Sequence, residues 1–207
     1  MTAPAPGPGR PRDPRTDQAI MLATRRLLAE VGYDQVSIES IAREAGVGRP
    51  TIYRRWPSKA HVVFDAAFGS PAAIGDMLAS SGDFDTDLRR FIAGVLDFWR
   101  EPVVAAAALG ILADRTRDPQ LQIRTQQLLD EETRTQFGAL VQSGVDQGAV
   151  RADLDVDMLF DLLVGTSFYT AQVLLRDHDA DEAIERLCFL IMQGAQPRDP
   201  QPNGDPP

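Results

Sequence analysis

The chain has 207 residues, of which 43% are hydrophobic and 25% charged, so it can bury one core or two small ones and is not a disordered polypeptide. Its single cysteine excludes an internal disulfide framework and cysteine-rich zinc sites. The longest apolar run, residues 102–113, is shorter than the roughly 20 residues that cross a bilayer, and residues 1–10 lack a secretory signal. We expect a soluble cytoplasmic protein without a membrane partner.

The net charge of −9 first argues against a nucleic-acid partner, but the charge is unevenly distributed. Residues 1–60 carry ten basic and six acidic side chains, which gives +4, whereas the remainder has a balance of −13. Such asymmetry can direct one end of a molecule towards a polyanion. It can also arise by chance along any chain, so the charge alone leaves both explanations open.

The two ends of the chain show no hydrophobic period. Residues 1–14 contain five prolines in a Gly/Ala background, which is typical of a flexible arm. The Gly-Arg-Pro-Arg segment 9–12 within it suits a narrow minor groove, although a solvated tail has the same composition. Residues 195–207 are rich in Pro, Gln and Asp and are expected to be disordered.

Between these ends, hydrophobic spacing predicts an all-α protein of about nine helices. In the N-terminal part, one helix has apolar residues from Ile20 to Val31 and stops at Gly32, a second spans 37–46, a third ends before Pro57, and a fourth begins at Ser58. The later helices span residues 88–99, 102–113, 118–147, 155–174 and 181–193. Residues 102–113 are apolar on all sides, which predicts a fully buried helix.

Residues 37–56, SIESIAREAGVGRPTIYRRW, have the pattern of a helix-turn-helix. Two short helices are separated by about four residues, with Gly46 at the turn, where a positive φ is required. Ala42 is small where the second helix crosses, and Ile52 and Trp56 fill the crossing. An ordinary helical hairpin could use the same turn, but the exposed Arg, Tyr and Thr side chains favour DNA binding.

Helical geometry defines the outer face of the second helix. With Ile52 directed inward, a rotation of 100° per residue places Pro50 and Arg54 opposite it, and Thr51 and Tyr53 on the flanks. Residues on the outer face would meet base edges, and those on the flanks would donate to phosphates.

Pro50 also bears on where this helix begins. Proline suits the first helical turn and disfavours the α conformation for the residue before it, which predicts Arg49 as the N-cap. Lys59 adds a charge beside the free N–H groups that begin the next helix. The predicted DNA-binding residues are Ser37, Arg49, Pro50, Thr51, Tyr53, Arg54, Arg55 and Lys59.

Segments 29–33, 37–42 and 46–59 resemble, in order and spacing, the TetR family of one-component transcriptional repressors. The resemblance implies that the first three helices bind DNA, that the others form a ligand-binding and dimerisation body, and that the last two helices pair across a two-fold axis. The family's phosphate-contacting tyrosine and lysine correspond to Tyr53 and Lys59, and its aromatic core position to Trp56. Gly48 departs from the serine of many members, which removes a side-chain cap.

A small-molecule pocket is expected among the apolar residues of the body, because such pockets are mostly apolar with a few polar groups. The candidates are Phe91, Val95, Trp99, Leu112, Phe137 and Phe168. Aromatic residues at helical spacing are more often plain core, so we expect only two or three of the aromatic residues to line it.

Other chemistry is not indicated. Cys188 lies on an apolar stripe, where a thiol is inert. His61 and His178 have no partner at metal-ligand spacing. The sequence has no nucleophile elbow, phosphate loop or dinucleotide fingerprint. We expect no catalytic residues, no metal and no cofactor.

These patterns predict an arm at 1–14, a DNA-binding domain at 15–60, a ligand-binding and dimerisation domain at 61–194, and a tail at 195–207. The expected function is that of a homodimeric repressor that binds a double-stranded palindromic operator and is released by an unknown small-molecule inducer. An architectural or activating DNA-binding protein without an inducer stays open. So does a helical enzyme or carrier that uses the first helices for packing only.

Overall fold

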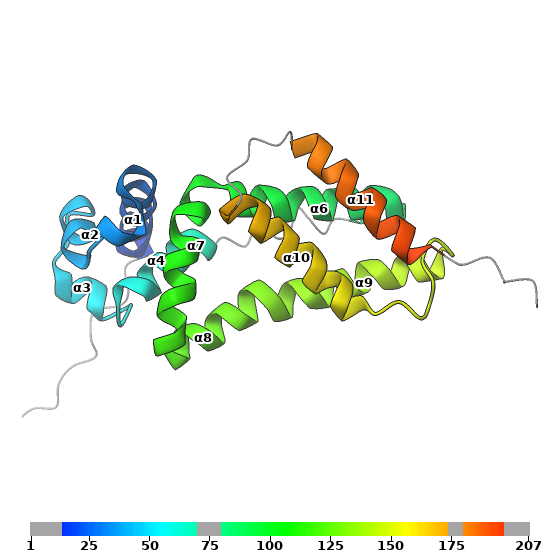
Figure 1. The fold of residues 1–207 in the computed structure, drawn as a ribbon. Coiled ribbons are helices and arrows are strands. Elements are labelled where there is room, and N and C mark those ends of the chain that lie inside the picture. Colours follow the sequence, from blue (N-terminus) through cyan, green and yellow to red (C-terminus); the bar gives the residue numbers. More distant parts are fainter. Residues whose placement is uncertain (1–13, 70–79, 174–179, 197–207) are drawn as a thin grey trace, which may run out of the picture.

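The computed structural model describes residues 14–69, 80–173 and 180–196, and every regular element among them is helical (Figure 1). The head consists of α1 (Pro14–Gln35), α2 (Ile38–Glu44) and α3 (Arg49–Tyr53), and α4 (Lys59–Phe68) leads from it into the body. The body contains α6 (Phe84–Arg100), α7 (Pro102–Asp114), the 3-10 turn η1 (Arg115–Arg117), α8 (Pro119–Gln126), the π turn η2 (Gln127–Glu131), α9 (Glu132–Asp146), α10 (Val156–Gln172) and α11 (Ala180–Ala195). The all-α fold with an N-terminal helix-turn-helix and a helical C-terminal part is confirmed.

Side-chain caps set the start of several helices. Ser37, Asp118 and Asp155 each accept a hydrogen bond from a main-chain N–H in the first turn of α2, α8 and α10, respectively. Each satisfies an amide that would otherwise have no partner in its helix. Gly148, in the turn before α10, has a φ of 72°, a conformation that favours glycine.

Three helices differ in detail from expectation. The segment 118–147 is helical as predicted, but it contains the π turn η2, for which hydrophobic spacing gives no signal. The first helix runs past a kink at Gly32 (φ 73°), and Val31 is exposed because the buried stripe passes through Leu28. The prediction that α7 is fully buried is wrong, since Leu109 is 55% exposed. Leu109 and Ala113, one helical turn apart, form an exposed stripe, whereas Val104, Ala107 and Ile111 are buried.

The helix ends lie close to the predicted segment limits. Pro14 is the first residue of α1, and Ala195 is the buried last residue of α11, where its carbonyl accepts a hydrogen bond from the Arg151 N–H at 2.9 Å. The predicted boundary between residues 60 and 61 lies inside α4. The arm motif 9–12, the expected helix end at Leu174, His178 and the tail from 197 onward lie outside the described residues.

The core joins head and body through α4. Helices α1, α4 and α7 pack on one another, and Val62, Val63 and Phe68 of α4 are buried as predicted. Arg25 of α1 donates to the Ala66 carbonyl at 2.7 Å, which further fixes the two helices together. The head is therefore firmly attached to the helix that enters the body. Within the described residues, none of the helices has the length and apolar character that a membrane span requires.

Candidate nucleic-acid interface

The turn between α2 and α3 has the geometry that its sequence predicts. Gly46 has a φ of 66°, and the following Val47 N–H donates to the Ala42 carbonyl at 2.9 Å. At the start of α2, the Ser37 hydroxyl accepts from the Ser40 N–H, and the Ser40 hydroxyl accepts from the Ser37 N–H, which forms a capping box. Ser37 is thus engaged in its own helix start.

Two buried side chains hold α3 in place. Ile52 is fully buried, and Trp56 is buried and donates from Nε1 to Asp65 Oδ2 of α4 at 2.6 Å. Ala42 is buried beneath the crossing, as its small size predicts. The short helix therefore sits on a rigid base and can present its opposite face at a defined angle.

That opposite face is open. Pro50, Tyr53 and Arg54 are exposed, with Tyr53 at 52%, and Thr51 is half-buried beside them. The only hydrogen bond of the Arg54 guanidinium to a described residue runs from Nη2 to Thr51 Oγ1 at 3.3 Å. The expectation that Arg49 caps α3 is wrong, because Gly48 occupies the extended N-cap position and Arg49 is the first helical residue.

Arg49 is exposed but forms an ion pair on the surface. Its Nη1 donates to Glu39 Oε1 of α2 at 2.8 Å. This hydrogen bond holds the pKa of the Glu39 carboxyl below its usual range. Because both groups are solvent-exposed, the pair is weak and a phosphate or a base edge can replace the carboxylate.

Two of the predicted contact residues are used inside the protein. The Arg55 side chain is only 12% exposed, forms an ion pair with Asp17 of α1, and donates from Nη1 to the Thr51 carbonyl at 2.9 Å. Lys59 donates from Nζ to the Tyr33 carbonyl at 3.0 Å and lies 4.0 Å from the centre of that ring. The structure thus groups Arg49, Pro50, Thr51, Tyr53 and Arg54 on one surface and leaves Arg55 out.

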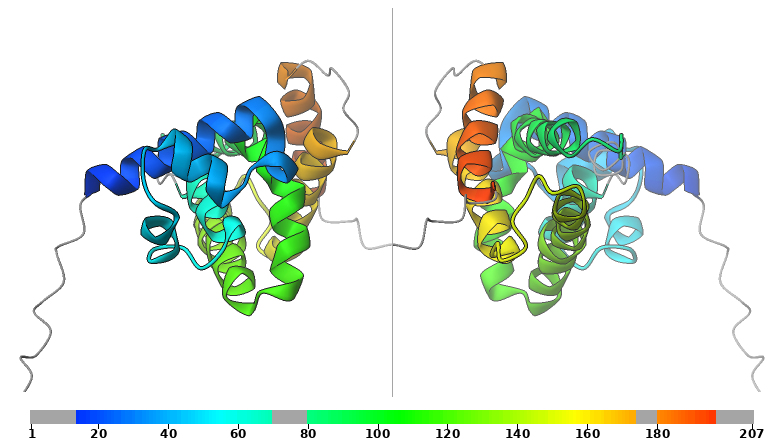
Figure 2. Two further views of the ribbon diagram at one scale, coloured as in Figure 1. Left: turned by 90° about the vertical axis from the view of Figure 1, so that its left-hand side faces the viewer. Right: turned by 90° about the vertical axis from the view of Figure 1, so that its right-hand side faces the viewer.

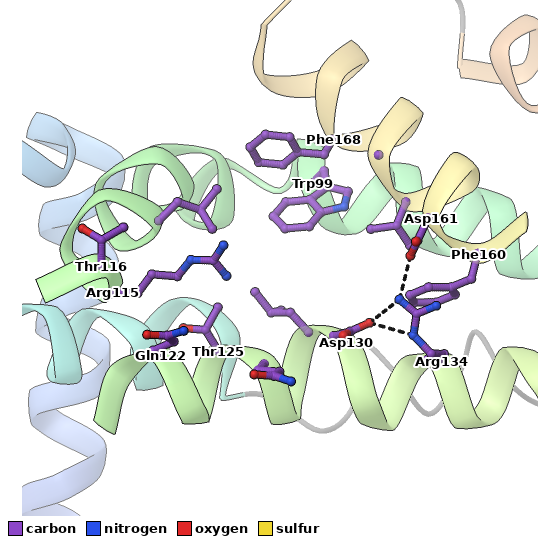
Figure 3. A pocket seen from close by; sticks show the side chains of 15 residues that line it. Trp99, Arg115, Thr116, Gln122, Thr125, Asp130, Arg134, Phe160, Asp161 and Phe168 are labelled. Atoms are coloured by element: carbon purple, nitrogen blue, oxygen red, sulfur yellow. Dashed lines mark hydrogen bonds and ion pairs between the residues drawn. The ribbon is translucent and has the colours of Figure 1, made fainter. Parts of the chain in front are cut away.

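The body contains a pocket of about 790 Å³ between α6, α7, η1, α8, η2, α9 and α10. Of the six predicted residues, Trp99, Leu112 and Phe168 line it, and Figure 3 labels Trp99 and Phe168. Phe91, Val95 and Phe137 are instead buried in the core, where the Phe91 and Phe137 rings lie 5.0 Å apart. Cys188 is also buried, and burial raises the pKa of its thiol, as expected for an inert cysteine.

Sequence reasoning missed the charged lining of this pocket. Arg134 of α9 forms ion pairs with Asp130 at 2.8 Å and Asp161 at 2.6 Å, and its guanidinium lies 4.4 Å from the Phe160 ring (Figure 3). Arg115 also lines the pocket. No local pattern marks these residues, because the helices that carry them meet only in the folded chain. Asp130 belongs to the π turn, a feature found frequently at functional sites.

Comparisons with known proteins agree with this arrangement. Residues 20–66 match the family described as bacterial regulatory proteins, tetR family, and residues 78–188 match the tetracyclin repressor-like C-terminal domain. The chain belongs to the TetR family of transcriptional regulators. Its DNA-binding part is therefore the helix-turn-helix described above, and both matching families are regulators rather than enzymes.

Relatives and solved structures of the TetR family cover most of the chain. An uncharacterised HTH-type regulator of Bacillus subtilis, YdeS, is 30% identical over 194 residues, which is 91% of this chain and 93% of YdeS. A DNA-binding transcriptional repressor of Mycobacteroides abscessus, TetR, is 26% identical over 86% of this chain and 95% of its own length. The fatty acid degradation regulator FadR of Bacillus halodurans has the same fold, with a TM-score of 0.69, 19% identity, and coverage of 91% and 100%.

This TetR-family chain also has an apolar surface on its last two described helices. Helices α10 and α11 both pack on α6, and Figure 2 shows them on one side of the body. Met158, Leu162 and Leu190 are exposed and line one hollow between these helices. The full set of exposed large apolar residues on the two helices and the C-cap of α10 is Met158, Leu162, Tyr169, Val173, Phe189 and Leu190. We call this set the α10/α11 surface. An apolar surface that spans two helices is typical of contact with another protein surface.

Proposed function

We propose that the protein is a ligand-responsive transcriptional repressor that acts in the cytoplasm, binds a palindromic operator as a homodimer, and is released by a small-molecule inducer. The observation that carries this proposal is the exposed face of α3, which stands on the buried Ile52 and Trp56. The division into a DNA-binding domain (15–60) and a ligand-binding and dimerisation domain (61–194) belongs to the same proposal.

The residues on the open face of α3, and two residues at neighbouring helix starts, have proposed roles at the operator. Arg49, Pro50 and Arg54 face base edges, and the long guanidinium side chains can donate to guanine. Thr51 and Tyr53 donate to phosphates, which fixes the orientation on the duplex. Ser37 contributes through the start of α2. Lys59 is the first residue of α4, and its ammonium, which spends one of three donors on the Tyr33 carbonyl, can still donate to a phosphate. We leave Arg55 out, because its guanidinium pairs with Asp17.

The α10/α11 surface supports the homodimer. Leu162 of α10 and Leu190 of α11 are 59% and 66% exposed, and both line a hollow of about 390 Å³ between the two helices. A second copy related by a two-fold axis would cover these side chains with its own. The two heads would then meet an inverted repeat with half-site centres about 34–36 Å apart, or a multiple of that distance.

A chain of contacts supports communication between the pocket and the head. Gln122, Thr125 and Gln126 of α8 line the pocket. On the same helix, Arg124 forms an ion pair with Asp65 of α4. Asp65 in turn accepts the hydrogen bond of Trp56, which holds α3. A ligand that moves α8 would thereby bias the angle of the head, with a coupling free energy of about 1–3 kcal/mol.

This chain of contacts makes a prediction about stability. Asp65→Ala leaves the Trp56 N–H and the Arg124 guanidinium without their shared partner. We expect the free energy of unfolding to fall by about 1–3 kcal/mol and operator affinity to fall with it. Arg124→Gln removes the partly exposed ion pair and the contact of the guanidinium with the Phe64 ring, but keeps the Trp56 hydrogen bond, so it should cost less than Asp65→Ala, about 1 kcal/mol. Denaturant unfolding measures both, and equal losses would show that the Trp56 bond has no such role.

A gel-shift titration with the region upstream of the protein's own gene tests the proposed function. At two salt concentrations, we expect affinity at least about 1,000-fold above that for random DNA and a marked loss at the higher salt. Equal affinity for random DNA would favour an architectural protein. Transcription from that region should rise when the gene is deleted, and a fall would instead indicate an activator.

A further inference from the structure

The two arginines that line the pocket differ in their ion pairs. At one end, the Arg134 guanidinium is surrounded by the carboxylates of Asp130, Asp161 and Asp157. At the other end, Arg115 makes no side-chain hydrogen bond or ion pair with any described residue. Figure 3 shows its guanidinium projecting into the pocket on the side of Trp99. Arg115 is therefore the charged lining group that lacks a counter-ion within the described chain.

The residue next to Arg115 does not supply one. Asp114 accepts a hydrogen bond from the Tyr33 hydroxyl of α1, and its carboxylate makes no ion pair with Arg115. That contact raises the pKa of Tyr33, after the larger effect of burial. The Asp114 carboxylate is thus engaged by Tyr33 of the head. The Arg115 guanidinium can therefore bind an acceptor from a ligand in the pocket.

Arg115 shares its side of the pocket with the polar Thr116, Gln122 and Thr125, and the wall across from it is apolar (Figure 3). Trp99, Leu112 and Phe168 line the same pocket, and the Trp99 and Phe168 rings lie edge to face with centres 5.0 Å apart. A guanidinium beside such walls loses part of its hydration and gains most from a charged acceptor that makes two parallel hydrogen bonds. The Gln122 amide, which no described side chain engages, can add a donor.

From these contacts we infer that the ligand of this pocket is an amphipathic anion, with a carboxylate or similar single oxyanion on Arg115 and an apolar body against Trp99, Leu112 and Phe168. The volume of about 790 Å³ admits a molecule of ordinary small-ligand size. This inference rests on the proposed function, because it names the chemical class of the inducer.

Matched probes test the inference in the full-length protein. Decanoate, decan-1-ol and decyltrimethylammonium share one chain and differ in head-group charge. Each is titrated by calorimetry, the two ions below their micelle-forming concentrations and decan-1-ol below its solubility limit. We expect decanoate to bind at least about tenfold more tightly than the other two. Absence of decanoate binding at millimolar concentration, or equal binding of all three, overturns the inference. Tightest binding of the cation would also overturn it, and would point to Asp130 and Asp161.

Two variants assign the effect to one side chain. Arg115→Gln should weaken decanoate binding by about 10- to 100-fold and leave decan-1-ol binding within about twofold. Arg117→Gln, an exposed arginine of the same turn that does not line the pocket, should change neither. Equal loss of decanoate binding in both variants contradicts the assignment. Since the Arg115 side chain forms no hydrogen bond or ion pair with a described residue, unfolding temperatures should match the parent.

A separate measurement distinguishes this inference from the proposed function. Operator affinity is measured with and without saturating decanoate. Binding through Arg115 together with weaker operator affinity supports both. Binding through Arg115 with unchanged operator affinity supports the ligand class and contradicts induction through this pocket.

Discussion

A Leu162→Glu, Leu190→Glu double variant is expected to be a monomer and to bind the operator at least about 100-fold more weakly than the parent protein. Both leucines are more than half exposed on the α10/α11 surface, so glutamate at these positions is solvated in the isolated chain and leaves its fold intact. In the proposed dimer, the same carboxylates would be buried against apolar side chains, which is strongly unfavourable. Loss of the second head removes the effective concentration that linkage provides, typically worth 100- to 10,000-fold.

Analytical ultracentrifugation and operator titration measure the two parts of this prediction separately. Leu109→Glu is the matched control, because Leu109 is exposed to a similar extent but lies on α7. We expect this control to stay dimeric. If the double variant remains a dimer, the interface lies elsewhere. If it is a monomer with full operator affinity, the proposal that both heads of a dimer bind the operator is wrong.

Arg54→Ala should lower operator affinity by about 5- to 150-fold, the equivalent of about 1–3 kcal/mol, and relax the preference at one base pair of each half-site. The Arg54 guanidinium is exposed on the open face of α3, and its only bond to a described residue is a long one to Thr51. It is therefore available for a bidentate contact with guanine. Arg117→Ala removes the same charge from the body and should leave affinity nearly unchanged.

Tyr53→Phe provides the contrast. Tyr53 is half-exposed on the flank of α3, and loss of a phosphate contact should weaken binding to all operator sequences about equally. Titrations against a panel of single-base operator variants separate the two behaviours. If Arg54→Ala also lowers affinity uniformly across that panel, then Arg54 contacts the DNA backbone and its proposed role is wrong.

Much of the head follows from the sequence because its determinants are local. Gly46 is needed within the turn itself, and the inward direction of Ile52 follows from helical geometry over a few residues. The caps Asp118 and Asp155 act on the turn that directly follows them. Such features involve neighbours within about four residues, so a single sequence displays them.

Where sequence reasoning failed, the decisive partner is distant along the chain. The sequence predicts a DNA contact for Arg55, whereas the structure pairs its guanidinium with Asp17 in the first turn of α1, a helix whose contact with Arg55 no local pattern indicates. Arg134 and Asp161 are likewise joined only by the packing of α9 on α10. The N-cap of α3 lies at Gly48, one residue before the predicted Arg49, because Gly48 already has the extended backbone conformation that an N-cap requires.

Selection of bound sequences from a random DNA pool, with the full-length protein, tests the central claim most directly. The account predicts enrichment of an inverted repeat, with half-site centres about 34–36 Å apart or a multiple of that distance along the duplex. Each half-site should contain a base pair at which Arg54→Ala loses its preference. Recovery of sequences without a shared motif, or of one unrepeated half-site, would contradict a dimeric repressor that reads its operator through the exposed face of α3.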